Sequence, residues 1–358
     1  MTFDELLHLP AFSLDQPRKQ AALLNELTAL TEWHRDRCAP YRRILDAVWP
    51  HPAGSLDQIP YLPIGLFKTH RLLSVPDDQI AVTLTSSGTT GQSVSRVYLD
   101  RVTAQRQTLA LGHTMCHLLG PKRLPMILVD TRSLLKDRSQ FSARGAGLIG
   151  MMNFGRRHFW ALDETMQLDV EGLRRFVSEY GGAPFLLFGF TFMVWQYLYQ
   201  QAAGSGIDLS NGILIHSGGW KKLQDQAVGN PEFKRRLNDA TGIGRVYSFY
   251  GMAEQVGSVF LEGDDGFLYT SNFSDLIVRD PDTWREAPLG APGVIQVLSA
   301  LPVSYPGHSI LTEDLGVIHG IDDSCCGRRG KYFSVIGRVP RAELRGCSDT
   351  HAAPASRA

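Results

Sequence analysis

The sequence predicts an α/β protein with mixed β-sheets flanked by helices, and three observations lead to this fold class. Apolar, β-prone runs alternate along the chain with stretches of helical periodicity. Several of these runs lead into glycines, hydroxyl groups or an acid, at the position where open α/β sheets place their ligands. The chain has 358 residues and 43% of them are hydrophobic, which is ordinary for a globular protein that buries a substantial core.

Composition and charge exclude several classes of function. The formal net charge is +0, so the sequence lacks the electrostatic footprint of a nucleic-acid-binding protein. No apolar run reaches the length of a membrane span, and the acidic N-terminus lacks a secretory pattern. We therefore expect a cytoplasmic protein with no membrane span and no nucleic-acid partner. The five cysteines are odd in number and scattered, which favours reduced thiols: Cys38, Cys116, Cys325, Cys326 and Cys347.

The N-terminal part of the chain is expected to be helical. Residues 13–48 show helical periodicity, with Ser13 and Asp15 as candidate caps and a break at Pro40. Four prolines predict that residues 50–63 form an irregular connection between this helical part and the strands that follow.

The stretch from Thr85 to Gln92 follows residues 80–84, an apolar run that we expect to be a strand. Its two glycines let the backbone turn sharply and approach a ligand, and its N–H and hydroxyl groups suit a phosphate chain. It is not a Walker A loop, because it has no lysine. The alternative is an ordinary turn rich in serine, threonine and glycine. The residues expected to cradle phosphates are Ser86, Ser87, Gly88, Thr89, Thr90 and Gly91.

The middle of the chain alternates between apolar runs typical of strands and stretches with helical periodicity. Asp130 ends one apolar run, where it is either a ligand-binding position or a cap or turn residue. The glycines of residues 145–150 lack the context of a dinucleotide fingerprint. We expect strands at residues 95–99 and 125–130 and helices at residues 100–119 and 168–180, the first of them capped by Asp100.

The most aromatic section is predicted to be a strand at residues 185–190 followed by a helix at residues 192–201. Core packing accounts for most of its aromatic side chains. The alternative is that Phe190, Thr191 and Trp195 line a pocket for an apolar acyl or aryl group.

Two later strands run into residues that suit a nucleotide. Residues 213–217 precede Gly218 and Gly219, whose backbone would let a flat base lie against it, although a simple β-turn is the alternative.

The second of these strands, residues 245–250, delivers an aromatic ring, a glycine and a carboxylate. Tyr250 can stack on a purine and Gly251 follows it directly. The carboxylate of Glu254 can hold Mg²⁺ against phosphates, because hard cations prefer oxygen ligands.

Four segments resemble, in order, four motifs of the adenylate-forming superfamily, which activates carboxylic acids with ATP. These segments are the hydroxyl-rich loop at residues 85–92, Tyr-Gly-x-x-Glu at 250–254, residues 309–316 and residues 336–340. The resemblance spans residues 85–338 and implies that ATP and Mg²⁺ bind. It also implies the fold of the large N-terminal domain of these enzymes, with an adenylation core at residues 1–336.

The third and fourth segments assign two further roles by resemblance. Asp314 matches the acid that binds both ribose hydroxyls, although Glu313 stands where glycine is usual. The alternative for Asp314 is an acid that starts a turn. Arg338 lies in a Gly-Arg hinge motif and is expected to reach phosphate or ribose oxygens as a planar fork.

The chain departs from most members of the superfamily at its C-terminal end. Only 20 residues follow Arg338 and no lysine lies beyond Lys331, so most of the usual C-terminal lid domain and its lysine are expected to be missing. Residues 337–358 are expected to form a hinge and a short mobile tail. This truncation resembles the acyl-protein synthetases related to LuxE of the bacterial luciferase operon.

In that family a fatty acid is adenylated, transferred to a cysteine near the C-terminus and handed to a partner reductase. Cys347 is the matching position, and Arg341 and Arg345 beside it would favour its thiolate form. The resemblance therefore implies Cys347, Glu254 and Arg338 as catalytic residues. An inert cysteine in a frayed terminus is the alternative.

Three functions remain open at this point. The first is ATP-dependent activation of a fatty or aryl acid, with transfer to Cys347 and then to a partner such as a reductase or a carrier protein. The second keeps the adenylation but passes the acyl group directly to coenzyme A, a carrier protein or an amine. The third is a non-catalytic, nucleotide-binding subunit of an acyl-reductase complex.

Overall fold

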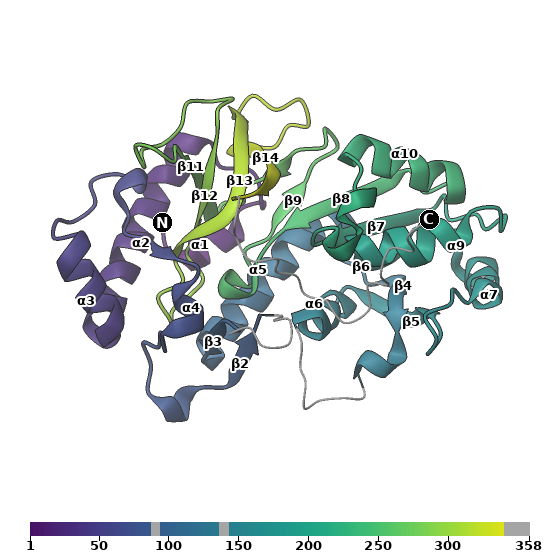
Figure 1. The fold of residues 1–358 in the computed structure, drawn as a ribbon, viewed down its shortest axis with the longest axis horizontal. Helices are drawn as coiled ribbons and strands as arrows, with labels where there is room; N and C mark the ends of the chain where they lie inside the picture. Colours follow the sequence, from purple (N-terminus) through teal and green to yellow (C-terminus); the bar gives the residue numbers. More distant parts are fainter. Residues whose placement is uncertain (87–93, 136–142, 340–358) are drawn as a thin grey trace. The chain divides into compact units, whose positions relative to one another are not determined.

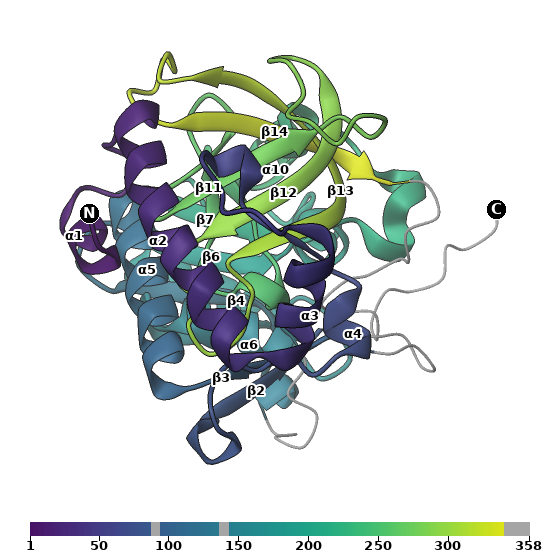
Figure 2. The same cartoon turned by 90° about the vertical axis from the view of Figure 1, so that its left-hand side faces the viewer.

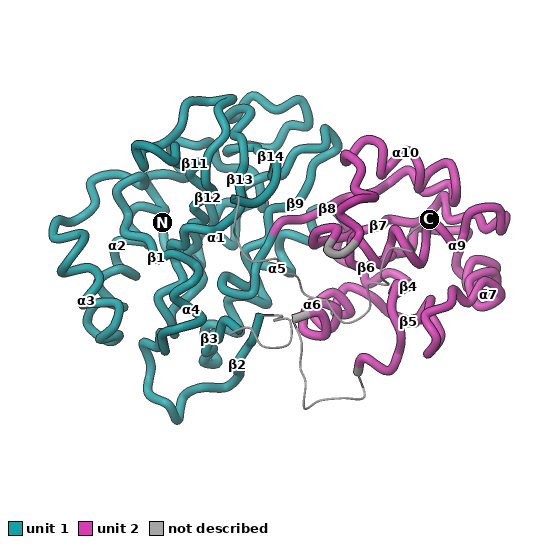
Figure 3. The backbone as a smooth tube through the Cα atoms, viewed as in Figure 1, with its two compact units in different colours: residues 1–86, 91–118, 251–343 teal, residues 87–90, 119–250, 344–358 magenta. Residues whose placement is uncertain are grey.

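The computed structural model describes residues 1–86, 94–135 and 143–339, and the chain divides into two compact units (Figures 1 and 3). The first unit contains residues 1–86, 94–118 and 251–339, and the second contains residues 119–250 apart from 136–142. Within these described ranges, no helix is both long enough and apolar enough to cross a membrane.

Two helices of the first unit begin after the capping residues that the sequence predicts. The side chain of Asp15 caps one helix by accepting a backbone N–H from its first turn, and this helix ends at Cys38, just before Pro40. Asp100 caps another, because its carboxylate accepts the N–H of Thr103 at 2.7 Å. The helices are α1 (Phe3–His8), α2 (Gln16–Arg37), α3 (Ala39–Val48), α4 (Leu66–Thr69) and α5 (Arg101–Leu119), with short 3₁₀ turns at Leu56–Gln58 and Asp77–Gln79.

The first unit also contains most of the strands, and its main sheet is antiparallel. The strands are β1 (Leu62–Pro63), β2 (Val82–Thr85), β3 (Arg96–Leu99), β9 (Phe260–Glu262), β10 (Leu268–Tyr269), β11 (Ser274–Arg279), β12 (Pro292–Ser299), β13 (Ser309–Ile321) and β14 (Lys331–Arg338). The order is β11-β12-β13-β14-β10-β9, with β1 parallel to β13, while β2 and β3 form a separate antiparallel pair. Helix α2 lies against this sheet (Figure 2), and Leu23 and Leu27 join Phe273 and Ile277 in one core cluster.

The second unit is built on a parallel sheet. Its strands are β4 (Leu124–Thr131), β5 (Gly155–Leu162), β6 (Phe185–Phe190), β7 (Gly212–Ser217) and β8 (Arg245–Tyr250). They lie in the order β8-β7-β6-β4-β5, and β4, β6 and β7 are buried along almost their whole length. Such burial is expected of parallel strands that are covered on both faces.

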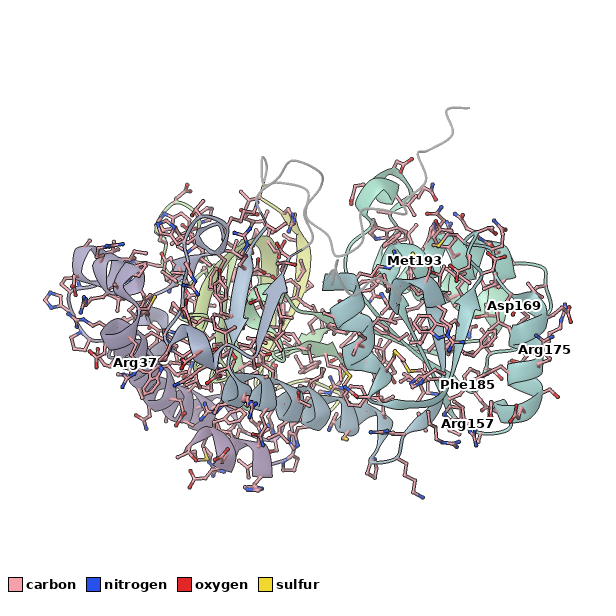
Figure 4. The ribbon with its side chains drawn as sticks, turned by 90° about the horizontal axis from the view of Figure 1, so that it is seen from below. Arg37, Arg157, Asp169, Arg175, Phe185 and Met193 are labelled. Atoms are coloured by element: carbon pink, nitrogen blue, oxygen red, sulfur yellow. The ribbon has the colours of Figure 1, made fainter. Side chains whose placement is uncertain are left out.

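The helices of the second unit follow these strands. Phe185 and Met193, labelled in Figure 4, mark the start of β6 and the helix that follows its end. The helices are α6 (Ala143–Met152), α7 (Val170–Tyr180), α8 (Thr191–Met193), α9 (Gln200–Ala202) and α10 (Asn230–Thr241), with a π-helical segment at Val194–Tyr199 between α8 and α9.

The structure refines three of the sequence-based expectations. Residues 192–201, predicted as one regular helix, contain the π-helical segment, which widens the helix beside Trp195. Residues 145–150 lie inside α6, so they form no nucleotide-binding loop. Residues 309–316 lie inside β13, so Asp314 does not start a turn. The division into a core at residues 1–336 and a tail stays a prediction.

Two buried histidines of the first unit stack on each other, and burial keeps both imidazoles uncharged. The rings of His34 and His308 lie 5.1 Å apart at 19°. His34 Nε2 donates to the carbonyl of Pro302 at 3.2 Å, so its Nδ1 accepts the hydroxyl of Ser74 at 2.7 Å. Burial lowers the pKa of His308 to about 3 and holds the pKa of His34 well below its usual value.

These pKa shifts predict a loss of stability in mild acid. The unfolded chain binds a proton at each histidine near pH 6.5 and the folded chain does not, so stability present above pH 6.5 is lost as the pH falls towards 3. For His308 the loss by pH 5 is about 2 kcal/mol. Urea unfolding of the wild type and of His308→Gln between pH 7 and pH 5 measures it: the variant is expected to lose that much less stability.

The exposed His51 supplies the control for this measurement. His51→Gln is expected to keep the pH dependence of the wild type, because it leaves both buried imidazoles in place. An unchanged pH dependence in His308→Gln would contradict the assignment of a neutral, buried imidazole.

Candidate functional site

The proposed phosphate loop is bounded by the hairpin of β2 and β3. Residues 87–93, and with them Ser87, Gly88, Thr89, Thr90 and Gly91, lie outside the described residues. Thr85 pairs with Arg96 at the end of the hairpin that leads into the loop. The Ser86 N–H donates to the Ser95 carbonyl at 3.1 Å, and the Ser86 hydroxyl accepts the Ser95 N–H at 2.9 Å. The hydroxyl of Ser86 therefore helps to close the hairpin.

Three of the predicted site residues lie at one edge of the parallel sheet in the second unit. Phe190 pairs with Ser217, and Ser217 pairs with Phe249, so β6, β7 and β8 end at the same level. Parallel strands place their ligands at this carboxyl edge. Gly218 and Tyr250, each the next residue along its strand, therefore lie next to each other in register.

Gly218 has a left-handed backbone conformation, with φ of +82°. A Cβ atom added there would lie 3.5 Å from Cδ1 of Phe190, which is ordinary contact, so the backbone and not the space requires glycine. Gly219 has neither a positive φ nor a neighbour within 4 Å of such a Cβ. Only Gly218 is needed for the turn. The space beside the backbone of Gly219, where a side chain would lie, is free of atoms of the described residues.

The three candidate pocket residues are buried in the second unit. Thr191 Oγ1 lies 2.9 Å from Nδ1 of His216, and burial lowers the pKa of His216 to about 3. Trp195 stacks on Phe233 with ring centroids 5.9 Å apart and is 3% exposed. These contacts favour the core-packing alternative for Trp195. Phe190 has a different environment, since its ring lies between two glycines, Gly218 and Gly147 of α6.

Glu254, the predicted magnesium ligand, is 3% exposed and lies in a 3₁₀ turn, Ala253–Gln255, in the first unit. The hydroxyl of Tyr305 donates to the Glu254 carbonyl at 3.0 Å, and the side-chain amide of Gln255 donates to the Gly307 carbonyl at 2.9 Å. These two bonds hold the turn against the segment that contains Tyr305 and Gly307. A buried carboxylate is a donor that suits Mg²⁺, so the residue present fits this cation.

Asp314 and Arg338 are brought together by strand pairing. They are partners in the antiparallel register of β13 and β14, and Arg338 Nε lies 3.2 Å from Asp314 Oδ1. Glu313, where glycine is usual, belongs to the extended strand β13, and its carbonyl accepts the N–H of Val339 at 2.9 Å. Extended backbone suits any L-residue, so the glutamate does not disturb the geometry at Asp314.

The proposed acyl acceptor, Cys347, lies outside the described residues, as do Arg341 and Arg345. The other cysteines carry free thiols: Cys38, Cys116, Cys325 and Cys326. These four cysteines are therefore reduced in the structure, as the sequence predicts.

The sequence did not single out Arg144, which forms a buried ion pair with Asp130. Arg144 follows the first residue of α6, and Asp130 is the penultimate residue of β4. Nε of Arg144 donates to Oδ2 of Asp130 at 2.8 Å, and Nη2 donates to Oδ1. An acid at the end of a buried strand and an arginine at the start of the next helix was the available signal. Asp130 thus has an ion-pair partner and is more than a turn residue.

Comparisons with known proteins identify relatives along nearly the whole chain. The family model described as "Acyl-protein synthetase, LuxE" matches residues 10–353. A long-chain-fatty-acid–luciferin-component ligase of Vibrio harveyi is 25% identical over 305 residues, which cover 82% of this chain and 77% of that protein. The ligase of the same name from Aliivibrio fischeri is 23% identical over 318 residues, covering 82% and 78%.

The fold is that of adenylate-forming enzymes. An open conformation of 2-hydroxyisobutyryl-CoA ligase, in complex with 2-HIB-AMP and CoA, matches with a TM-score of 0.66 and 18% identity. The match covers 92% of this chain and 74% of that one. The predicted α/β fold class is therefore confirmed.

The conformation of Gly218 predicts unequal effects of alanine at the two neighbouring glycines. Gly218→Ala is expected to lower the free energy of unfolding by about 1 kcal/mol or more, because a left-handed backbone disfavours a Cβ. Gly219→Ala is the matched control and is expected to change it by less than about 0.5 kcal/mol. Urea unfolding of both variants measures the difference, and equal effects would contradict the assigned turn.

Proposed function

Because the chain belongs to the acyl-protein synthetase (LuxE) family, we propose that it activates a carboxylic acid with ATP to an acyl-adenylate and releases pyrophosphate. The observation that carries this proposal is the pairing of Asp314 with Arg338. These two residues come from separate nucleotide-binding motifs of the superfamily, and one sheet brings them into contact. The enzyme is thus a ligase, and the names of its relatives favour a fatty acid as substrate.

Each motif residue has a proposed role towards the nucleotide. Asp314 holds the ribose hydroxyls with its two carboxylate oxygens, and the guanidinium of Arg338 contacts phosphate or ribose. The ion pair between them orients both groups before a nucleotide binds. The base lies against Gly218, Gly219 and Tyr250, and the hydroxyl-rich loop donates to the phosphates: Ser86, Ser87, Gly88, Thr89, Thr90 and Gly91.

Glu254 is proposed to hold Mg²⁺ through its buried carboxylate. When bound, this cation neutralises charge on the phosphates. Arg338 and the N–H groups of the loop donate to the α-phosphate oxygens, where negative charge develops as the acid attacks. These groups of the core are proposed to stabilise that developing charge.

The second step is proposed to be transfer of the acyl group to Cys347. The thiolate of Cys347 attacks the carbonyl carbon of the acyl-adenylate; the carbon–sulfur bond forms, the bond to the phosphate oxygen breaks and AMP leaves. A nucleophile of a partner, such as a reductase or a carrier protein, then attacks the thioester carbonyl; the carbon–sulfur bond breaks, the acyl group moves to the partner and the Cys347 thiolate is released. The description of the family, acyl-protein synthetase, supports a protein acceptor.

The two competing functions make different use of the same fold. Direct transfer to coenzyme A or an amine would bypass Cys347 and leave the adenylation unchanged. A distorted backbone at the unusual Glu313 would favour a non-catalytic subunit. The extended conformation of Glu313 in β13 speaks against such a distortion.

The role proposed for Glu254 predicts a loss of activity without a loss of folding. Glu254→Gln keeps the size of the side chain and removes its charge, so acid-dependent exchange of pyrophosphate into ATP is expected to fall by about 100-fold or more. The exposed Glu179→Gln is the control and is expected to keep full exchange. Full exchange in a folded Glu254→Gln would remove this residue from the metal site.

The role proposed for Cys347 predicts a covalent intermediate. Mass spectrometry of the protein incubated with ATP and a panel of acids is expected to show a thioester-sized adduct, absent from Cys347→Ala. Pyrophosphate exchange is expected to persist in that variant, because adenylation precedes the thiol step. An adduct retained in Cys347→Ala would place the acceptor elsewhere, and continuous pyrophosphate release with no adduct would favour a small-molecule acceptor.

A further inference from the structure

The ion pair between Asp130 and Arg144 is almost completely shielded from water. The side chain of Arg144 is 2% exposed and that of Asp130 is 0% exposed. Asp130 is fully engaged: Oδ1 accepts Nη2 of Arg144 and the N–H of Thr131 at 2.7 Å, and Oδ2 accepts Nε of Arg144. A buried ion pair of this kind contributes little net stability compared with apolar residues of the same size. Stability alone therefore does not explain why a charged pair occupies this position.

The third nitrogen of the guanidinium, Nη1 of Arg144, is the unusual atom. It is buried, and among the described residues it has no hydrogen-bond partner. A buried donor without an acceptor is costly, and more so when the donor belongs to a charged group. Nη1 therefore requires an oxygen acceptor that the described part of the chain does not supply.

The pair lies beside Phe190, one of the candidate pocket residues. Leu128 of β4 pairs with Phe188 of β6, so Asp130 and Phe190, each two residues further along, lie on the same face of the sheet. Gly147, one turn after Arg144 on α6, touches the Phe190 ring: a Cβ on this glycine would lie 3.4 Å from Cζ. The same helix thus contributes both the arginine and the contact to the ring.

We propose that Nη1 of Arg144 donates to an oxygen carried on the chain of the substrate acid, away from its reacting carboxyl group. The substrate class is then fatty or other organic acids that carry a hydroxyl or oxo substituent on the chain, in preference to the corresponding unsubstituted acids. This inference rests on the proposed function, because the ligand assigned to Nη1 is the acid to be activated, and it adds a place for that acid beside Phe190. It makes Arg144 a residue that determines specificity.

The charges of Asp130 and Arg144 determine whether the acceptor of the Nη1 hydrogen bond is a neutral oxygen or a carboxylate. Asp130 already neutralises the guanidinium, so a hydroxyl or oxo oxygen satisfies Nη1 without adding charge. A carboxylate at Nη1 would leave one uncompensated negative charge in a buried site, which is strongly unfavourable. The reacting carboxylate therefore binds elsewhere, and Nη1 receives the substituent.

Matched pairs of acids test the inference. Each pair has the same carbon chain, with one member carrying a hydroxyl or oxo group and the other unsubstituted. Binding to the full-length protein without ATP is measured by calorimetry, and pyrophosphate release is measured with ATP. The wild type is expected to prefer the oxygen-bearing member by about 10-fold to 100-fold, because the unsubstituted acid leaves Nη1 unpaired.

Two variants remove the third nitrogen in different ways. Arg144→Lys keeps a positive charge for Asp130 but lacks the fork, so the preference for the oxygen-bearing acid is expected to vanish. The double variant Asp130→Leu/Arg144→Met removes both charges together, so no uncompensated charge remains if the single variant fails to fold. The exposed Arg156→Lys is the control and is expected to keep the preference.

Three outcomes would overturn the inference or separate it from the proposed function. A wild type that binds both members equally shows that Nη1 holds only a water molecule. Equal loss of all acids in Arg144→Lys shows that the arginine holds the reacting carboxylate or only the fold. A preference in binding that Arg144→Lys removes, with no pyrophosphate release from any acid, overturns the proposed function and supports the inference.

Discussion

Strand register is the constraint on which the candidate site depends in each unit. In the parallel sheet, the register of β6, β7 and β8 brings Phe190, Gly218 and Tyr250 to one carboxyl edge. In the antiparallel sheet, the register of β13 and β14 brings Asp314 opposite Arg338. A slip of one residue would turn each of these residues to the opposite face of its sheet. The backbone hydrogen bonds between the strands therefore determine which site residues lie next to each other.

Buried polar groups are the second feature that the fold has to accommodate. His34 and His308 are kept neutral by burial, and hydrogen bonds to Ser74, Pro302 and Thr31 satisfy most of their nitrogens. Such groups disfavour alternative packings, because each would leave a polar atom unpaired. They also link the stability of the first unit to pH, although none of them takes part in the proposed reaction.

The two proposals assign different electrostatic characters to two regions of the chain. Glu254 brings a buried negative charge that suits a cation and, with it, phosphates. Asp130 and Arg144 cancel each other, and their neutral pair suits an uncharged substituent on an organic acid. An enzyme that joins a nucleotide to an organic acid needs a charged region for the phosphates and the reacting carboxyl group. It also needs an electrically neutral region for the carbon chain of the acid.

The sequence by itself determined the alternation of strands and helices, the helix caps at Asp15 and Asp100 and the order of the four motifs. These features depend on local periodicity, on single capping residues and on short contiguous patterns, which a linear reading contains. It also pointed to Asp314 and Arg338 separately, by resemblance.

Only the tertiary structure decided which of these residues meet. Asp314 and Arg338 are 24 residues apart, and Asp130 and Arg144 are 14 apart, so each contact depends on how the chain folds back. The sequence left Asp130 open between a ligand position and a turn, and it passed over Arg144 altogether. Burial and the hydrogen bonds of a buried side chain are set by long-range packing, which no local pattern in the sequence records.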